Sequence, residues 1–148
     1  MLYFDTSFVA PLILQETISE KVERFLSRLP AGELATSHLT RIEFSSLLAR
    51  EVRMGALTRQ AARTADAEFE TVMRESFMIL LPGIDDFDLA KEYLGDHGTG
   101  LRAADALHLA VAKNHDGQAI YSLDKTLLRA GKKLGLPVTT GIRLAEYR

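Results

Sequence analysis

The sequence predicts an α/β fold in which helices cover a parallel sheet of five strands. Two observations carry this prediction. Short apolar runs, which are typical of buried parallel strands, alternate with longer segments whose apolar residues have the spacing of a helix. Residues that break regular structure, such as Pro82 and Gly83, separate these segments. Strands that alternate with helices favour a parallel sheet with helices on both faces.

The first half of the chain contributes three of the predicted strands. The apolar run at residues 2–4 ends at a polar triplet, as a buried strand does where it enters a loop. Helical spacing covers residues 8–28, and Pro30 and Gly32 end it before a weak strand at residues 33–36. The other elements predicted here are a helix over residues 37–52, a helix that begins at Thr58 and a strand over residues 77–81.

The second half continues the alternation and supplies the last two strands. The elements predicted here are helices around residues 87–94 and 101–114, a strand at residues 119–122, a helix over residues 125–134 and a strand at residues 138–140. The sequence contains no repeat, low-complexity segment or long linker, and its four prolines are scattered. Residues 1–148 are therefore expected to form one domain.

Composition excludes several classes of protein. The chain has no cysteine, which rules out disulfide frameworks, thiolate catalysis and cysteine-based zinc sites and fits the cytosol. No apolar run approaches the roughly 18 residues that span a bilayer. Asp5 stands where a signal peptide would need a basic start and an apolar centre, so we expect a cytoplasmic protein without membrane contact. With 18 basic and 20 acidic residues, any contact with nucleic acid must come from a local basic patch.

Two predicted strands are followed closely by an aspartate. Asp5 comes directly after the strand at residues 2–4, and Asp124 comes after the strand at residues 119–122 with one leucine between. In open parallel sheets, ligands bind beyond the carboxyl ends of the strands, so both aspartates are candidate site residues. Each also has a structural interpretation, because helices are predicted soon after both and aspartate is a preferred helix cap.

A glutamate lies inside the apolar stripe of the helix predicted over residues 37–52. On a wheel of 100° per residue, Glu43 falls between the apolar residues Ile42 and Leu47. An ionised carboxylate withdrawn from water is costly unless it is compensated, so its position indicates a function. The alternative is a capping box in which Glu43 pairs with the backbone at Thr40, although Ser37 is an equally good cap three residues earlier.

An aspartate lies inside the apolar stripe of the helix predicted over residues 101–114. On the same kind of wheel, Asp105 falls between His108 and Leu109. Its alternative role is to complement the positive end of the helix dipole, which explains an acid near the helix start but not one that faces inward. His108 could pair with Asp105, but we expect a hydrogen-bonded core histidine rather than a metal ligand.

Convergence of these acids would create a site for a divalent cation. The candidate catalytic residues and metal ligands are Asp5, Glu43, Asp105 and Asp124. Four like charges in one cleft would raise pKa values unless a cation neutralised them, and an all-oxygen set suits Mg²⁺ or Mn²⁺ rather than zinc. Such ions activate water and stabilise the attacking and leaving oxygens of a phosphodiester. Supporting hydroxyls beside two of the acids come from Thr6, Ser7 and Ser122.

Four segments together carry a family resemblance. They are the strand that enters Asp5-Thr6-Ser7, residues 37–43, residues 101–110 and residues 121–125. On these segments, which span nearly the whole chain, the sequence resembles the PIN-domain ribonucleases and in particular the VapC toxins of toxin-antitoxin pairs. The Asp-Ala-Leu-His-Leu-Ala segment is the most specific piece, and the four candidate acids fall on the acidic positions of the family. The resemblance implies a three-layer α/β/α sandwich, Mg²⁺- or Mn²⁺-dependent cleavage of RNA, a homodimer and inhibition by a cognate antitoxin.

The last of the four segments departs from the family pattern. Ser122 stands where many relatives carry threonine, Leu127 stands where phenylalanine is frequent, and no second acid closely follows Asp124. The resemblance therefore does not assign a second metal ion. Basic residues next to three of the acids are candidate RNA contacts, with a solvated helix face as the alternative; they are Arg41, Arg102 and Lys125.

Three other functions are weighed against the nuclease. A receiver domain also has acids at strand ends and binds Mg²⁺ as a regulatory switch, but it needs paired acids near the end of the first strand, where only Asp5 is acidic. A haloacid-dehalogenase-type phosphatase needs a second aspartate at the position of Ser7. A catalytically silent binding module with the PIN fold stays open, because activity requires the acids to meet in space.

Overall fold

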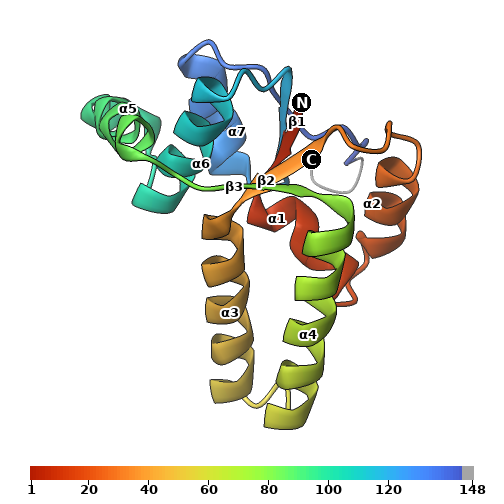
Figure 1. Cartoon of the computed structure of the whole chain (residues 1–148). Helices are drawn as coiled ribbons and strands as arrows, with labels where there is room; N and C mark the ends of the chain where they lie inside the picture. Colours follow the sequence, from red (N-terminus) through yellow and green to blue (C-terminus); the bar gives the residue numbers. More distant parts are fainter. Residues whose placement is uncertain (145–148) are drawn as a thin grey trace.

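The five strands form one parallel sheet, as predicted. The structure is a computed structural model that describes residues 1–144 (Figure 1). Its strand order is β3-β2-β1-β4-β5, and each neighbouring pair is parallel. The strands are β1 (Leu2–Phe4), β2 (Leu34–Ser37), β3 (Met78–Leu80), β4 (Ala119–Tyr121) and β5 (Val138–Thr139). The central position of β1 places the residues that follow it in the middle of the carboxyl edge.

Helices connect the strands and cover both faces of the sheet. They are α1 (Thr6–Val9), α2 (Ser19–Leu26), α3 (His38–Arg53), α4 (Arg59–Ser76), α5 (Ile84–Gly95), α6 (Ala103–Asn114) and α7 (Lys125–Lys133), with short 3-10 helices η1 (Ala10–Leu12) and η2 (His97–Thr99). Most of these lie where the apolar periodicity places them. Within residues 1–144, no helix combines the length and the apolar character needed to cross a membrane.

The continuous helix predicted over residues 8–28 is wrong. The chain instead forms α1, then η1, then a turn, and α2 begins only at Ser19. Pro11 lies at the start of η1. A proline has no backbone N–H and its ring clashes with the carbonyl four residues earlier in an α-helix, so α1 cannot continue through it. Apolar spacing alone does not reveal this break, because apolar residues line both pieces.

Two hydrophobic cores lie on opposite faces of the sheet and make the fold a three-layer α/β/α sandwich. Tyr3 and Phe4 are adjacent in β1 and point to opposite faces, as alternate residues of a strand do. Phe4 packs in the core under α1–α4, and Tyr3 packs in the core under α5–α7; both are fully buried. The predicted fold class is thereby confirmed.

The helices α3 and α4 form an antiparallel pair that extends away from the sheet (Figure 1). The rings of Phe44 and Phe69 stack with centroids 4.0 Å apart and join the two helices. The buried face of α3 therefore carries Phe44 and Leu48, whereas Ile42 is 69% exposed. The apolar stripe predicted around Ile42 is displaced, because α4 packs on another side of α3.

Candidate active site at the carboxyl edge of the sheet

Asp5 lies directly after β1 and is fixed by hydrogen bonds on both carboxylate oxygens. Oδ1 accepts from the Ser7 hydroxyl at 2.7 Å and from the backbone N–H of Phe8 at 3.1 Å, and Oδ2 accepts from the Ser122 hydroxyl at 2.6 Å. The residue is 3% exposed, and this burial raises the pKa of Asp5 despite the hydrogen bonds. Asp5 thus caps α1 and also presents a carboxylate at the sheet edge.

The two serines next to Asp5 connect the ends of β1 and β4. Their hydroxyls lie 3.2 Å apart. The backbone N–H of Leu123 donates to the Ser7 hydroxyl at 2.9 Å, and that of Asp124 donates to the Ser122 hydroxyl at 3.0 Å. Ser7 and Ser122 therefore fix the loop after β4 relative to Asp5, which is the orienting task expected of supporting hydroxyls.

Asp124 occupies the N-cap position of α7. Its Oδ1 accepts from the backbone N–H groups of Thr126 at 2.8 Å and Leu127 at 3.1 Å. Capping therefore accounts for one of its two carboxylate oxygens. Its negative charge also acts on Asp105, whose pKa it helps to raise. The loop after β4 therefore carries one acid into electrostatic range of another on α6.

The capping-box interpretation of Glu43 is wrong. The helix α3 begins at His38, and its N-cap is Ser37, whose hydroxyl accepts from the backbone N–H of Leu39 at 3.2 Å. The hydroxyl of Thr40 is instead 2.8 Å from that of Thr36 on β2. Glu43 consequently lies in the second turn of α3, beyond the reach of a capping role.

Glu43 contacts two polar side chains, one at the start of α1 and one on α6. The Thr6 hydroxyl donates to Oε1 at 2.7 Å, and the His108 Nε2 also makes a hydrogen bond to Oε1. Burial alone would raise the pKa of Glu43, but the contact with His108, the Thr6 hydrogen bond and the charge of Arg102 outweigh it and lower the pKa. Glu43 is thus a fixed and ionised carboxylate.

His108 is a hydrogen-bonded core residue, as expected. It is 1% exposed, and its Nδ1 lies 2.7 Å from the hydroxyl of Tyr3 on β1. Its acidic partner is Glu43 on α3, however, and not Asp105 on its own helix. The structure therefore adds Tyr3 to the site, which sequence patterns could not indicate, because Tyr3 lies inside an apolar strand and is 105 residues from His108.

Asp105 has a buried carboxylate oxygen without a hydrogen-bond partner. Its Oδ2 makes no hydrogen bond within the described part of the chain, and it forms a long ion pair, at 3.8 Å, with the Nε of the exposed Arg102. Burial and the charge of Asp124 raise the pKa of Asp105, with a further contribution from Glu43, and the charge of Arg102 opposes them. A buried carboxylate oxygen without a hydrogen bond is costly, and one long ion pair with an exposed arginine compensates little of that cost, so a proton or a further cation would stabilise this carboxylate.

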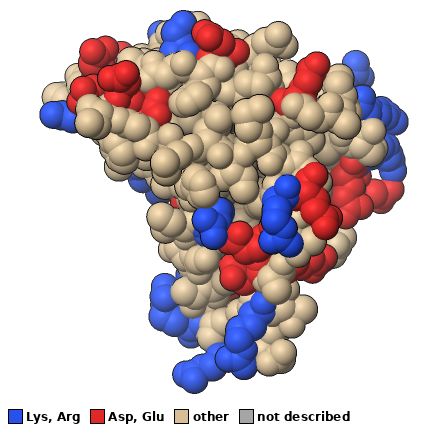
Figure 2. Space-filling model, in the orientation of Figure 1, with Lys and Arg blue, Asp and Glu red and all other residues tan. Residues whose placement is uncertain are grey.

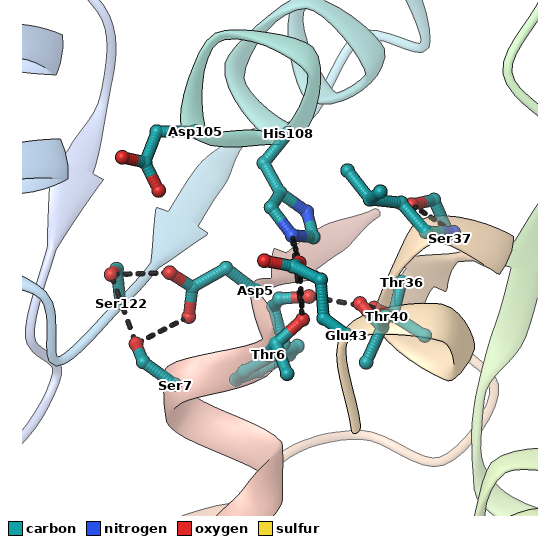
Figure 3. A network of polar contacts seen from close by, with 12 residues as sticks. Asp5, Thr6, Ser7, Thr36, Ser37, Thr40, Glu43, Asp105, His108 and Ser122 are labelled. Atoms are coloured by element: carbon teal, nitrogen blue, oxygen red, sulfur yellow. Dashed lines mark hydrogen bonds and ion pairs between the residues drawn. The ribbon is translucent and has the colours of Figure 1, made fainter. Parts of the chain in front are cut away.

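Three of the predicted acids face a shared space. Figure 3 shows the carboxylates of Asp5, Glu43 and Asp105 around the region beneath the first turns of α6, with that of Asp5 turned toward Ser7 and Ser122 at its edge. Residues 1–144 nevertheless contain no group of three or more His, Asp or Glu side chains with the spacing of a formed metal site. The acids are therefore brought to one region without being drawn into a coordination shell.

The basic residues proposed to contact RNA differ in how closely they pair with acidic side chains of the protein. The Nε of Arg41 donates to both carboxylate oxygens of Glu70 on α4, at 2.9 and 3.1 Å. Arg102 is 80% exposed in its side chain and pairs only loosely with Asp105. Lys125 opens α7 immediately after Asp124. On the face seen in Figure 2, Lys and Arg are interspersed with Asp and Glu, so the basic residues there do not form one broad patch.

Comparison with known families agrees with this fold. Residues 2–133 match the PIN domain, so the chain belongs to the PIN-domain family. This membership confirms the resemblance inferred from the four sequence segments and favours a nuclease over a receiver or a phosphatase. A comparison with curated proteins found no match.

Solved structures with the same fold include toxins and their complexes. VapC20 of Mycobacterium tuberculosis, described as a sarcin-ricin loop cleaving toxin, has 24% identity and a TM-score of 0.70, over 88% of this chain and 95% of its own. VapBC-1 of nontypeable Haemophilus influenzae has 12% identity and a TM-score of 0.69, over 95% and 98%. A toxin-antitoxin complex from Klebsiella pneumoniae has 17% identity and a TM-score of 0.66, over 97% and 100%. At these identities the likeness shows the shared fold.

Proposed function

We propose that the chain is a Mg²⁺- or Mn²⁺-dependent endoribonuclease, the toxin of a VapBC-type pair. The observation that carries this proposal is the buried Oδ2 of Asp105, which lacks a hydrogen-bond partner among residues 1–144 and faces the same space as Asp5 and Glu43. A divalent cation in that space would satisfy this oxygen and offset the repulsion among the carboxylates.

The donor set fits a hard divalent ion. The acids that would hold it are Asp5, Glu43 and Asp105, with Asp124 next to them, and all of their donor atoms are carboxylate oxygens. Oxygen ligands of this kind suit Mg²⁺ and Mn²⁺, which retain several water molecules when bound by a few carboxylates. The raised pKa values of Asp5 and Asp105 fit the same proposal, because each carboxylate would ionise fully when a cation is near.

The chemistry would be hydrolysis of an RNA phosphodiester. A bound ion would supply activation of water and stabilisation of the phosphate oxygens. The chain contributes orientation: Ser7 and Ser122 fix the Asp5 carboxylate, and Thr6 and His108 fix that of Glu43. Arg102, whose side chain is largely exposed beside Asp105, is positioned to contact an RNA phosphate at the rim.

The partners follow from the same assignment. The similarity to solved toxin-antitoxin complexes supports a cognate antitoxin that blocks the site. A homodimer and a cytoplasmic location complete the proposal, together with RNA contacts from Arg41 and Lys125 in addition to Arg102. Release of Arg41 from Glu70 would be required before it could contact RNA fully.

A cleavage assay tests the function. Purified protein is incubated with total RNA in Mg²⁺ or Mn²⁺, the cut sites are mapped, and EDTA is added to a parallel sample. We expect cleavage that EDTA stops and that Asp5→Asn or Asp105→Asn abolishes without unfolding the protein. Asp88→Asn is the matched control, because Asp88 is exposed on α5 and outside the site. Equal cleavage by wild type and both site variants, or full activity in EDTA, would contradict the proposal.

A growth assay distinguishes the nuclease from a silent PIN-fold module. Expression without antitoxin should arrest growth, and the Asp5→Asn and Asp105→Asn variants should be harmless at equal protein levels. A folded wild-type protein that neither cleaves RNA nor affects growth would favour the binding module.

A further inference from the structure

A line of three polar groups, two of them buried, crosses the core and ends at the candidate active site. It begins at the Tyr3 hydroxyl on β1, continues through the imidazole of His108 on α6 and ends at the Glu43 carboxylate on α3. We propose that His108, aligned by Tyr3, is a positioning residue that directs Glu43 toward the cation. This inference rests on the proposed function and assigns tasks to two residues that the metal-binding acids do not include.

The side chains in this line are in close contact with one another. Tyr3 is fully buried and His108 is 1% exposed, so neither group can use solvent as a hydrogen-bond partner. The hydroxyl of Tyr3 lies 2.7 Å from Nδ1, and Nε2 contacts Glu43 Oε1. The Tyr3 and His108 rings also meet edge to face, with centroids 5.9 Å apart. The imidazole is therefore fixed at both nitrogens and in its plane.

Hydrogen-bond chemistry assigns a direction to the line. An ionised carboxylate only accepts hydrogen bonds, so Nε2 must carry the proton that it shares with Glu43. In a neutral imidazole, Nδ1 is then an acceptor, and the Tyr3 hydroxyl donates to it. Burial raises the pKa of Tyr3 far above its ordinary value, so the hydroxyl keeps its proton. Tyr3 thereby selects the tautomer in which His108 donates to Glu43.

The consequence for Glu43 is that its two oxygens have separate tasks. Thr6 and His108 both contact Oε1, which leaves Oε2 as the oxygen that we assign to the cation. A glutamate side chain has considerable rotamer freedom to lose on ordering. Two donors on one oxygen remove that freedom before the ion arrives, so the ion binds a carboxylate that is already oriented.

Two substitutions of His108 separate positioning from packing. His108→Gln keeps an N–H group at the same number of bonds from the backbone as Nε2, whereas His108→Leu fills the space without a donor. If His108 only packs the core, both variants should affect the protein through stability alone. If it positions Glu43, the glutamine should retain a function that the leucine loses.

The test is a calorimetric titration of each folded protein with Mn²⁺, with thermal unfolding recorded alongside. We expect His108→Leu to weaken Mn²⁺ binding by roughly 10–100-fold, the range typical of groups that orient metal ligands. His108→Gln should restore most of the affinity, and Tyr3→Phe should cause a smaller loss. Because His108 acts through Glu43, His108→Leu should add little to the loss already caused by Glu43→Gln.

Two results would overturn the inference. One is a folded His108→Leu protein that binds Mn²⁺ as wild type does, and the other is a full additional loss in the His108→Leu/Glu43→Gln double variant. If His108→Leu does not fold, Tyr3→Phe decides, and unchanged affinity there overturns the role of Tyr3. Nitrogen NMR of the Mg²⁺-loaded protein should show a protonated Nε2 and a bare Nδ1; the reverse tautomer would contradict the proposed direction.

Failure of the proposed function is a separate outcome. If wild type and Asp5→Asn bind Mn²⁺ equally poorly, the metal site itself is absent and both proposals fall. If wild type binds and Asp5→Asn does not, while the folded His108→Leu protein matches wild type, only the positioning role of His108 is lost.

Discussion

The hydroxyl of Ser122 donates to Oδ2 of Asp5 at 2.6 Å and so connects the loop after β4 to the residue that follows β1. The two strands are neighbours in the sheet, but the residues are 117 positions apart in the chain. Asp5 is nearly inaccessible to water, so this donor replaces solvent for one of its oxygens. The contact therefore serves the fold and the site together.

Replacing Ser122 by alanine should reduce both stability and cleavage. The variant leaves a buried carboxylate oxygen without its donor, which costs about 1–3 kcal/mol in the free energy of unfolding. Loss of orientation should lower RNA cleavage by roughly 10–100-fold. Urea unfolding and the cleavage assay measure the two effects. Ser27→Ala is the control, because the Ser27 hydroxyl contacts only an exposed backbone carbonyl on α2. Wild-type stability and activity in Ser122→Ala would refute this account of Asp5.

The stability of the metal-free protein should depend on pH through Asp105. Burial and the charge of Asp124 raise its pKa above the ordinary value of 3.8, so the folded state binds the proton more tightly than the unfolded state. The contribution of Asp105 to the free energy of unfolding is fully present below that ordinary value. This contribution is lost as the pH rises through the raised pKa. In EDTA, Asp105→Asn should therefore become more stable than wild type as the pH rises above about 4.

In the same experiment, the contribution of Glu43 to stability should change with pH in the opposite direction. The pKa of Glu43 is lowered from 4.5, so its contribution to the free energy of unfolding is present above that value. The contribution is lost as the pH falls through the lowered pKa. Wild type should thus exceed Glu43→Gln in stability near neutral pH, and the difference should shrink on acidification. Urea unfolding across the pH range measures both variants. Parallel pH profiles for the two would show that the electrostatic description of the site is incorrect.

Added Mn²⁺ should stabilise wild type and leave Asp105→Asn nearly unchanged. An ion that binds only the folded state adds about 2.7 kcal/mol at a free concentration of 100 times its Kd. The gain should appear as a higher melting temperature in calorimetry. Ca²⁺ at the same concentration checks for selectivity, because it prefers more ligands at longer distances than this set offers. An equal shift for wild type and Asp105→Asn would place the ion elsewhere.

Much of the architecture could be predicted because local patterns determine it. The helix caps at Ser37 and Thr58 and the proline-glycine break after β3 set boundaries that the structure reproduces closely. The break inside residues 8–28 was missed because Pro11 lies among apolar residues that continue the helical spacing. Periodicity reports which side of a segment is apolar, but it does not report where a backbone hydrogen bond is lost.

The acids of the candidate site could be predicted, but the side chains that orient these acids could not. Asp105 faces inward as the helical wheel places it, whereas the apolar stripe that was assigned to Glu43 includes the exposed Ile42. Which side of α3 is covered depends on α4, and a wheel drawn for one helix contains no information about its neighbour. The link from Tyr3 through His108 likewise joins β1 to α6 across the core, so no local spacing could reveal it.

The close packing of α7 against β5 should affect both the stability of the fold and the candidate site. A Cβ on Gly131 would lie 2.3 Å from Cγ1 and 3.2 Å from Cβ of Val138, so rotation of the valine side chain cannot relieve the clash. Gly131→Ala should lower the unfolding free energy by about 1–3 kcal/mol. Combining it with Val138→Ala should recover part of that loss, since the two sites are in contact. Gly95→Ala is the matched control, because nothing lies within 4 Å of its added Cβ. Since Asp124 is the N-cap of α7, Gly131→Ala should also weaken cleavage. Urea unfolding measures wild type, Gly131→Ala, Val138→Ala, the double variant and the Gly95→Ala control, and an additive loss in the double variant would show that the clash with Val138 is not the cause.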